Sequence, residues 1–259
     1  MKPPIVLLTD FGLTDPFVGV MKGVILKITP RVPLVDLSHG ITPQDISQGS
    51  LVLKTSYTYF PPQTIFVTVI DPGVGSKRKA IILKTKNYTF VAPDNGILYP
   101  IFISNASSCI YEIKNDQFFL NPVSHTFQGR DVFAPVAAYL SKRVSPKSFG
   151  PRILHLKKLT WPHPWIKSKT LLGEIIAIDR FGNLMTNIEA RHLAGTPTKL
   201  TIYFRNKTIR GLRTSYAEVK KGKLLAILGS MGFLEIATNQ GSAQAILKAK
   251  IGDQIKIVK

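Results

Sequence analysis

The chain has 259 residues, and its composition excludes several classes of protein. An apolar fraction of 44% suffices for a packed core, but no apolar run approaches the roughly 20 residues of a membrane span. Cys109 is the single cysteine, so an intrachain disulfide is excluded and a reducing cytoplasm is expected. The formal net charge of +19 is compatible with a nucleic-acid partner. The cations are scattered, however, and no aromatic–basic RNA-binding motif accompanies them, which favours a generally basic surface.

In the first part of the chain, short apolar runs alternate with segments of helical period. Strands are predicted at 5–9, 32–37, 64–70, 80–84, 88–92 and 109–113, and helices at 16–29, 42–59, 97–103 and 129–140. Within the second of these helices, Thr42 is expected as the N-cap, with Pro43 at the first helical position. The alternation predicts an α/β domain with a mainly parallel sheet.

Three acids stand where predicted strands end: Asp10, Asp71 and Asp94. Ligands of parallel sheets bind beyond the carboxyl ends of the strands, so these acids are expected to converge on one edge. Asp71 is followed by a Pro-Gly turn and then by Arg78, a candidate ion-pair partner for a carboxylate that is costly to bury alone. Taken alone, Asp71 is better interpreted as the cap of its own turn with Arg78 solvated. The convergence with the other two acids favours a ligand site.

The second part of the chain is predicted to be all-β. Strands are expected at 172–178, 184–188, 199–204, 208–212, 224–228, 234–237 and 255–258, which indicates a small barrel or sandwich. Before these strands, residues 150–169 contain both tryptophans and show neither a helical nor a strand period. We therefore expect an α/β domain at 1–155, a linker at 156–169 and a barrel-like domain at 170–259. The loop Asp179–Asn183, and the loop Gly229–Gly232 with the segment Thr238–Ser242 that follows the next strand, carry polar groups, although hairpin-turn chemistry alone accounts for each.

Several common sites are missing from the sequence. No G-x-G-x-x-G follows the first strand, and neither a phosphate-binding P-loop nor a G-x-S-x-G nucleophile motif is present. The five histidines lack the spacing of zinc ligands, so no metal or bound cofactor is expected.

The motifs together resemble the S-adenosyl-L-methionine hydroxide adenosyltransferase family, the hydrolases related to the fluorinating and chlorinating enzymes. The matching stretches follow the family's order over almost the whole chain: Thr9–Gly12, Val69–Gly75, Pro93–Gly96, Thr126–Asp131, Ile178–Asn183 and Gly229–Asn239. The resemblance implies an α/β domain followed by a β-barrel, and a homotrimer that binds its small-molecule substrate between subunits. It implies hydrolysis of S-adenosylmethionine to adenosine and L-methionine, without metal, by attack of water or hydroxide at ribose C5′.

The resemblance also implies roles for particular residues. Asp71 and Arg78 match the family's catalytic pair and would orient and activate the water, with Gln128 as the third member. The substrate-binding positions divide by the part of the substrate they would meet. Asp10 would bind the ribose, Asp15, Asp179 and Ser230 the methionine end, and Asn183 and Asn239 the adenine, while Asn95 belongs to the same substrate-binding set.

The sequence departs from the family pattern at Gln128, where the family has a histidine in a Phe-His-Gly-Arg-Asp motif. An amide cannot titrate, but it can hold water by hydrogen bonds. This departure keeps open a second function, a protein that binds S-adenosylmethionine or adenosine with little turnover. The fluorinating relatives carry a tyrosine at position 71, an arginine at position 231 and an insertion between Lys84 and Tyr88, so halide chemistry is not expected here.

Overall fold

Two units make up the structure, a computed structural model that describes residues 2–168, 170–193 and 200–258. Unit 1 is Met1–Thr160 and unit 2 is Trp161–Lys259. Lys169, the last residue of the expected linker, and Lys199, the first of one expected strand, lie outside the described residues.

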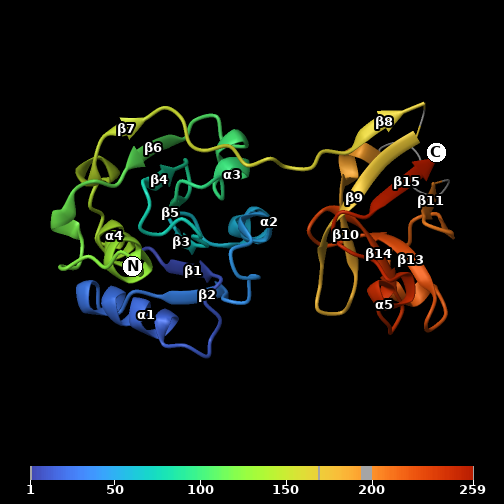
Figure 1. Ribbon diagram of the computed structural model, residues 1–259, viewed down its shortest axis with the longest axis horizontal. Coiled ribbons are helices and arrows are strands. Elements are labelled where there is room, and N and C mark those ends of the chain that lie inside the picture. Colours follow the sequence, from blue (N-terminus) through green and yellow to red (C-terminus); the bar gives the residue numbers. More distant parts are fainter. Residues whose placement is uncertain (1, 169, 194–199, 259) are drawn as a thin grey trace. The chain divides into compact units, whose positions relative to one another are not determined.

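Unit 1 is built on a seven-stranded sheet of order β2-β1-β3-β5-β4-β6-β7 (Figure 1). Its strands are β1 (Ile5–Thr9), β2 (Leu34–Ser38), β3 (Ile65–Val69), β4 (Ala80–Lys84), β5 (Thr89–Pro93), β6 (Cys109–Glu112) and β7 (Arg152–Ile153). Strands β2, β1, β3 and β5 are mutually parallel, whereas β4, β6 and β7 pair in antiparallel fashion. The predicted α/β fold class is confirmed.

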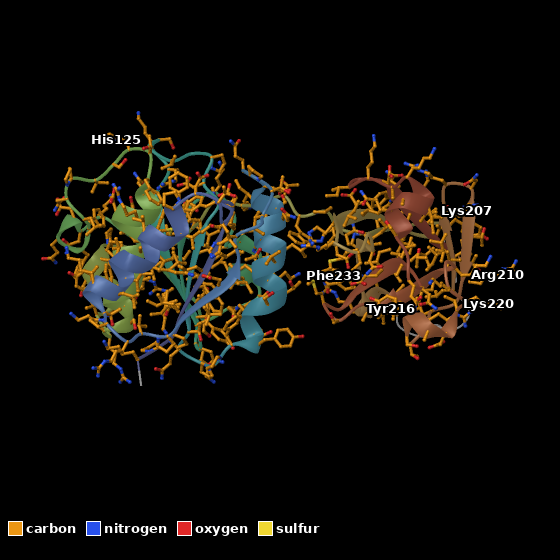
Figure 2. The ribbon with its side chains drawn as sticks, turned by 90° about the horizontal axis from the view of Figure 1, so that it is seen from below. His125, Lys207, Arg210, Tyr216, Lys220 and Phe233 are labelled. Carbon is orange, nitrogen blue, oxygen red and sulfur yellow. The ribbon has the colours of Figure 1, made fainter. Side chains whose placement is uncertain are left out.

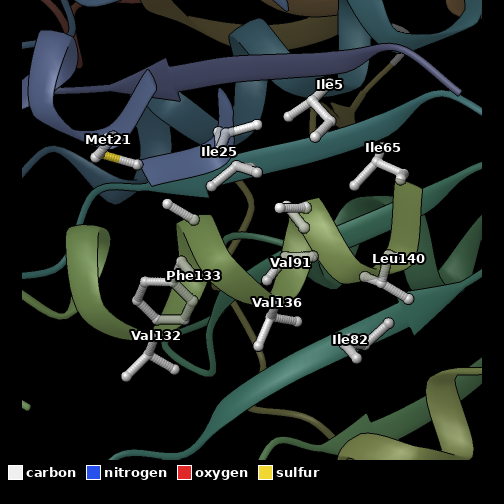
Figure 3. Close-up of a cluster of buried hydrophobic side chains, with 14 of the residues drawn as sticks. Ile5, Met21, Ile25, Ile65, Ile82, Val91, Val132, Phe133, Val136 and Leu140 are labelled. Atoms are coloured by element: carbon white, nitrogen blue, oxygen red, sulfur yellow. The ribbon is translucent and has the colours of Figure 1, made fainter. Parts of the chain in front are cut away.

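Helices cover both faces of this sheet, which explains why its strands are continuous apolar runs. The helices are α1 (Phe17–Ile28), α2 (Ile46–Ser56), α3 (Tyr99–Ile103) and α4 (Ala134–Ser141), the last preceded by a π-helical turn at Gly129–Phe133. Ile5 and Leu7 of β1 pack in the cluster that includes α1 and α4, while Val6 and Leu8 pack in the cluster that includes α2 and α3. Figure 3 shows α4 against the strands of the first cluster.

Helix α2 begins later than predicted, because Asp45 and not Thr42 is its N-cap. The Asp45 carboxylate accepts a hydrogen bond from the Gln48 N–H. Gln44 has a left-handed backbone (φ 68°), which interrupts any helix starting at Pro43. The expectation for Thr42 was wrong because the two cap candidates lie three residues apart, and local sequence does not decide which of them has helical backbone after it.

Unit 2 is an antiparallel sheet of order β12-β11-β15-β9-β10-β14-β13, with β8 also paired to β9. Its elements are β8 (Trp165–Lys167), β9 (Thr170–Ile178), β10 (Leu184–Glu189), β11 (Thr201–Phe204), β12 (Lys207–Arg210), β13 (Leu224–Leu228), β14 (Phe233–Thr238), α5 (Ala243–Leu247) and β15 (Gln254–Val258). Arg213, just after β12, bridges to Ile227 of β13, so the sheet curls into a nearly closed barrel as predicted. Strand β8 lies within the range expected as a linker.

Short 3-10 helices complete the description at Tyr57–Tyr59, Asp116–Phe118, Pro146–Phe149, Ala190–Leu193 and Tyr216–Glu218. Among the described residues, every helix is too short or too polar to cross a lipid bilayer.

Candidate active site

The three acids at strand ends do lie along one edge of the unit 1 sheet. Strands β1, β3 and β5 are adjacent and parallel, so the segments that follow them leave the sheet on the same side. Asp94 is used by the fold, since its Oδ1 accepts a hydrogen bond of 2.7 Å from the Lys157 N–H. Asp10 likewise accepts a backbone hydrogen bond, from the Gln44 N–H, whereas Asp71 is paired with a side-chain cation.

Asp71 and Arg78 form a buried, two-pronged ion pair across the Pro72–Lys77 turn. Arg78 Nε lies 3.0 Å from Asp71 Oδ1 and 2.9 Å from Oδ2, and Nη2 donates to Oδ2 as well. The side chains are 4% exposed for Asp71 and 11% for Arg78. The guanidinium also lies over the Phe133 ring, 5.4 Å from its centroid. These contacts hold both groups in one orientation. Removing either partner would leave a buried charge uncompensated.

Gln128 joins this pair, although it lies far away in sequence. Its Oε1 accepts a hydrogen bond of 2.5 Å from Arg78 Nη2. Gln128 stands immediately before the π-helical turn that leads into α4, a distortion that is frequent at functional sites. The structure therefore brings together the three residues that were predicted to be catalytic.

Close backbone contacts hold the two loops of this cluster against each other. Gly75 has a left-handed backbone (φ 76°), and a β-carbon there would approach the His125 carbonyl oxygen to 2.6 Å. Only glycine satisfies both conditions. The buried Asp131 carboxylate accepts a hydrogen bond from the Ser124 N–H and so fixes the segment before Gln128. The His125 side chain is exposed on the surface of unit 1 (Figure 2).

The other predicted residues of unit 1 differ in their exposure and in the hydrogen bonds that their side chains make within the protein. Asp10 is half-buried, and its Oδ2 accepts a hydrogen bond of 2.7 Å from the Gln44 N–H. Asp15 is exposed in the turn before α1. Asn95 acts as a clip: its Nδ2 donates to the Ile70 carbonyl at 2.7 Å, while its Oδ1 accepts from the Ile97 N–H. The clip fixes the residue that directly precedes Asp71.

In unit 2, Asp179 and Asn183 belong to one tight turn between β9 and β10. Asp179 Oδ1 accepts from the backbone N–H groups of Phe181 and Asn183, and its Oδ2 accepts from Asn183 Nδ2 at 2.9 Å. The turn-capping interpretation of Asp179 therefore applies. The same bonds also hold the buried Asn183 side chain in a fixed orientation.

A cavity of about 430 Å³ opens beside this turn. It is lined by Asp179, Phe181, Asn183, Tyr216 and Thr238–Gly241, a set that includes Asn239. Volumes of this size are typical of small-molecule sites. Asn239 is anchored by a 2.7 Å hydrogen bond from its Nδ2 to the Val219 carbonyl. Ser230 lies outside the lining, exposed on the turn between β13 and β14.

Sequence reasoning missed Glu235, a buried acid close to this cavity. Its carboxylate packs directly against Gly229, and the side chain belongs to the otherwise apolar strand β14. Burial, and then the negative charge of Asp179, raise the pKa of Glu235 above its ordinary value. Burial and these two acids also raise the pKa of Tyr216. In the sequence, Glu235 could have been found as a lone acid within an apolar run. Asp71 was identified by a similar pattern, an acid at the end of such a run.

The raised pKa of Glu235 predicts a pH-dependent stability difference. An acid whose folded pKa lies above its unfolded value binds its proton more tightly when folded, so its ionised form opposes folding. Glu235→Gln is therefore expected to raise the free energy of unfolding of unit 2 at neutral pH. The gain should shrink as the pH falls through the folded pKa and disappear below the unfolded value.

Urea titrations that follow tryptophan fluorescence at several pH values would measure this difference, because both tryptophans belong to unit 2. Glu174→Gln, which removes an equal charge from the same unit, is the matched control. A Glu235→Gln gain that does not change with pH would contradict the electrostatic explanation.

The described residues contain no group of three or more His, Cys, Asp or Glu side chains placed to hold a metal ion. The polar groups gathered in the two units are instead carboxylates, amides and one guanidinium. Within either unit such groups can hydrogen-bond a small polar ligand.

Comparison with known proteins identifies the family. Residues 5–150 match the model of the SAM hydroxide adenosyltransferase N-terminal domain, and residues 173–256 match that of the C-terminal domain. The (R)-S-adenosyl-L-methionine hydrolase of Thermus thermophilus is 32% identical, over 98% of this chain and 99% of its own. A fluorinase of Nocardia brasiliensis is 27% identical, over 99% and 97%.

A solved structure has the same fold. The crystal structure of an uncharacterized conserved protein from Thermotoga maritima aligns with a TM-score of 0.92 and 37% identity, over 98% of this chain and 100% of that one. Two domain models in the right order, full-length relatives and this likeness agree with one another. The chain belongs to the SAM hydroxide adenosyltransferase family.

Proposed function

We propose that the protein hydrolyses S-adenosylmethionine to adenosine and L-methionine. The observation that carries the proposal is the buried cluster of Asp71, Arg78 and Gln128 in a member of this family. Relatives named (R)-S-adenosyl-L-methionine hydrolase, from Thermus thermophilus at 32% identity and Methanocaldococcus jannaschii at 34%, support it. The name of these relatives specifies the R form, so we further propose that the R sulfonium epimer is the preferred substrate.

In the proposed reaction, a water oxygen forms a bond to ribose C5′ while the C5′–S bond breaks. The sulfur keeps the electron pair and leaves as the neutral thioether of methionine, so the positive charge of the sulfonium is lost. The water proton goes to solvent or to a carboxylate. Loss of charge is favoured in a site of low polarity, and water needs a positioned acceptor to act as a nucleophile.

Asp71 and Arg78 are suited to this chemistry. The contacts of Arg78 with Asp71 and Gln128 use its Nε and Nη2, so the Nη1 hydrogens can hold a water or stabilise a hydroxide. Asp71 accepts from the same water and keeps the guanidinium in place. Gln128 orients Arg78 and contributes a further acceptor.

For the rest of the substrate we propose contacts from both units. Asp10 serves the ribose, Asp15, Asp179 and Ser230 the methionine end, and Asn183 and Asn239 the adenine, while Asn95 belongs to the same substrate-binding set. Glu235 adds negative charge near Asp179, which suits an ammonium group. We also propose a cytoplasmic homotrimer with substrate bound between subunits, an assembly that light scattering would test by mass.

The deciding experiment incubates the enzyme with each sulfonium epimer in the presence of a chelator and separates the products by chromatography. Adenosine and methionine in equal amounts are expected. Absence of adenosine at high enzyme load would reject hydrolysis. Tight calorimetric binding of adenosine without product would favour the second candidate, a binding protein with little turnover, which the non-titrating Gln128 motivates.

Gln128→His tests whether a missing proton relay limits the rate. Because Gln128 already accepts a hydrogen bond from Arg78, and a hydroxide stabilised by Arg78 needs no relay during attack, we expect kcat to be unchanged or lower. Rates of both proteins measured from pH 5 to 9 would check this. General acid–base assistance is worth about a hundredfold or more, so a gain of that size with a new titration near neutrality would overturn the expectation.

A further inference from the structure

A chain of polar contacts runs from the surface of unit 1 to the turn after β1. Lys22 Nζ of α1 lies 2.6 Å from Asp36 Oδ2 of β2, and Asp36 Oδ1 lies 3.0 Å from His39 Nε2. His39 Nδ1 then lies 2.8 Å from Thr9 Oγ1, which accepts from the Phe11 N–H at 3.2 Å. The ion pair is partly exposed, but the His39 side chain is only 2% exposed and Thr9 is fully buried.

The partners determine where the protons of this chain lie. The Asp36 carboxylate oxygen 3.0 Å from Nε2 favours a hydrogen on that nitrogen, because a bare lone pair would be repelled by it, although the contact lacks hydrogen-bond alignment. Burial raises the pKa of Asp36, but the hydrogen bond from Lys22 and the close contact with His39 outweigh burial and leave it below its ordinary value. In the neutral imidazole, Nδ1 is then an acceptor and receives the Thr9 hydroxyl hydrogen. The Thr9 oxygen keeps a lone pair for the Phe11 N–H.

His39 holds the chain on both sides of Asp10. Its side chain acts through Thr9 on Phe11, and its backbone carbonyl accepts a 2.8 Å hydrogen bond from the Gly12 N–H. Gly12 has a left-handed backbone (φ 65°), a conformation that glycine adopts without strain. Asp10, between these anchors, is oriented further by the Gln44 N–H.

We propose that His39 is a positioning residue, which as a neutral imidazole with its hydrogen on Nε2 locks the Thr9–Gly12 turn and so orients the Asp10 carboxylate for the ribose. The inference rests on the proposed function, because Asp10 is assigned to the ribose there. His39 touches neither the substrate nor the reacting atoms. Its effect belongs to nucleoside affinity and not to the chemical step.

The neighbouring strands offer a matched pair of substitutions. Thr9→Val removes the hydroxyl without changing shape and leaves His39 Nδ1 and the Phe11 N–H without their partner. Thr68→Val makes the same change in β3, where Thr68 is equally buried and its Oγ1 has no hydrogen-bond partner among the described residues. Thr9→Val is expected to raise the calorimetric Kd for adenosine, and KM, by about three- to tenfold, with kcat little changed. Thr68→Val is expected to leave all three unchanged.

A second pair of variants tests the histidine itself. His39→Asn offers an amide oxygen near the place of Nδ1 and is expected to retain most of the affinity, whereas His39→Leu should lose it. Nitrogen NMR of imidazole-labelled protein should show His39 neutral with its hydrogen on Nε2. The NMR measurement requires no activity and therefore identifies the tautomer in any case. The proposed function fails by a different result, a wild-type protein that neither binds adenosine nor hydrolyses S-adenosylmethionine.

Three results would contradict the role proposed for His39. A hydrogen on Nδ1 in the NMR spectrum contradicts the proposed proton positions. A Thr9→Val protein that binds adenosine as tightly as Thr68→Val contradicts the positioning role. A fall in kcat at constant KM would move His39 into the chemical step and would also reject it. If His39→Leu does not fold, as judged by circular dichroism, the threonine pair still decides.

Discussion

Asp71→Asn is expected to lower kcat by about a hundredfold or more while KM changes only a few-fold. Asparagine keeps the size of the side chain but removes the charge that balances Arg78 and accepts from the attacking water. Its amide nitrogen would also face the guanidinium in place of an oxygen. Because the group acts on the water and not on the nucleoside, the loss belongs to the chemical step. Steady-state kinetics with product chromatography would measure it.

Asp94→Asn is the matched control for this prediction. It makes the same chemical change at the end of the adjacent parallel strand, where the remaining amide oxygen can still accept from the Lys157 N–H. Wild-type kinetics are expected for it. If Asp71→Asn stays within a few-fold of wild type, our central assignment is wrong. A circular dichroism spectrum of each variant would separate loss of catalysis from loss of fold.

Phe133→Ala is expected to destabilise unit 1 by about 3–5 kcal/mol, the usual range for a fully buried aromatic side chain. Phe133, in the π-helical turn before α4, is completely buried in the cluster that α1, α4 and the sheet share (Figure 3). Its truncation leaves a cavity that rigid strands cannot fill. The ring also supports the Arg78 guanidinium, so activity should fall as well.

Guanidinium chloride titrations followed by far-ultraviolet circular dichroism would measure this loss, since tryptophan fluorescence reports on unit 2 alone. Tyr59→Ala is the control, because Tyr59 is 79% exposed and surface substitutions usually stay within about 0.5 kcal/mol. A cost below about 1 kcal/mol for Phe133→Ala would show that the core around α4 is not packed as described.

Patterns between near neighbours in the sequence predicted the architecture well. Continuous apolar runs indicated strands buried on both faces, and α1 to α4 do cover both faces of the unit 1 sheet. Arg78 follows Asp71 across one short turn, which made it a candidate partner for a carboxylate that is costly to bury alone, and the structure shows the pair. Alternation and turn residues likewise predicted the strands of unit 2 from β9 onward, because strand period depends only on the chain itself, but they missed β8, which lies in the range expected as a linker.

Other features depend on packing between distant segments. The Thr42 cap was wrong because the backbone of Gln44, which donates to Asp10, has a conformation that delays the helix to Asp45. The two backbone hydrogen bonds of the Asn95 side chain could not be predicted either, since one of them goes to the carbonyl of Ile70, which follows β3 and is distant in sequence.

The amino-acid sequence by itself determined the strand and helix pattern and the acids at the strand ends, and it made Arg78 a candidate partner of Asp71, because each depends on residues close together along the chain. Only the tertiary structure decided that Gln128 contacts Arg78 and that Lys22, Asp36, His39 and Thr9 form one chain of contacts. It also decided that Glu235 lies near Asp179. In these cases the hydrogen-bond direction and burial of a polar group are set by which elements pack together, and a polar residue has the same local signature whether it faces solvent or a buried partner.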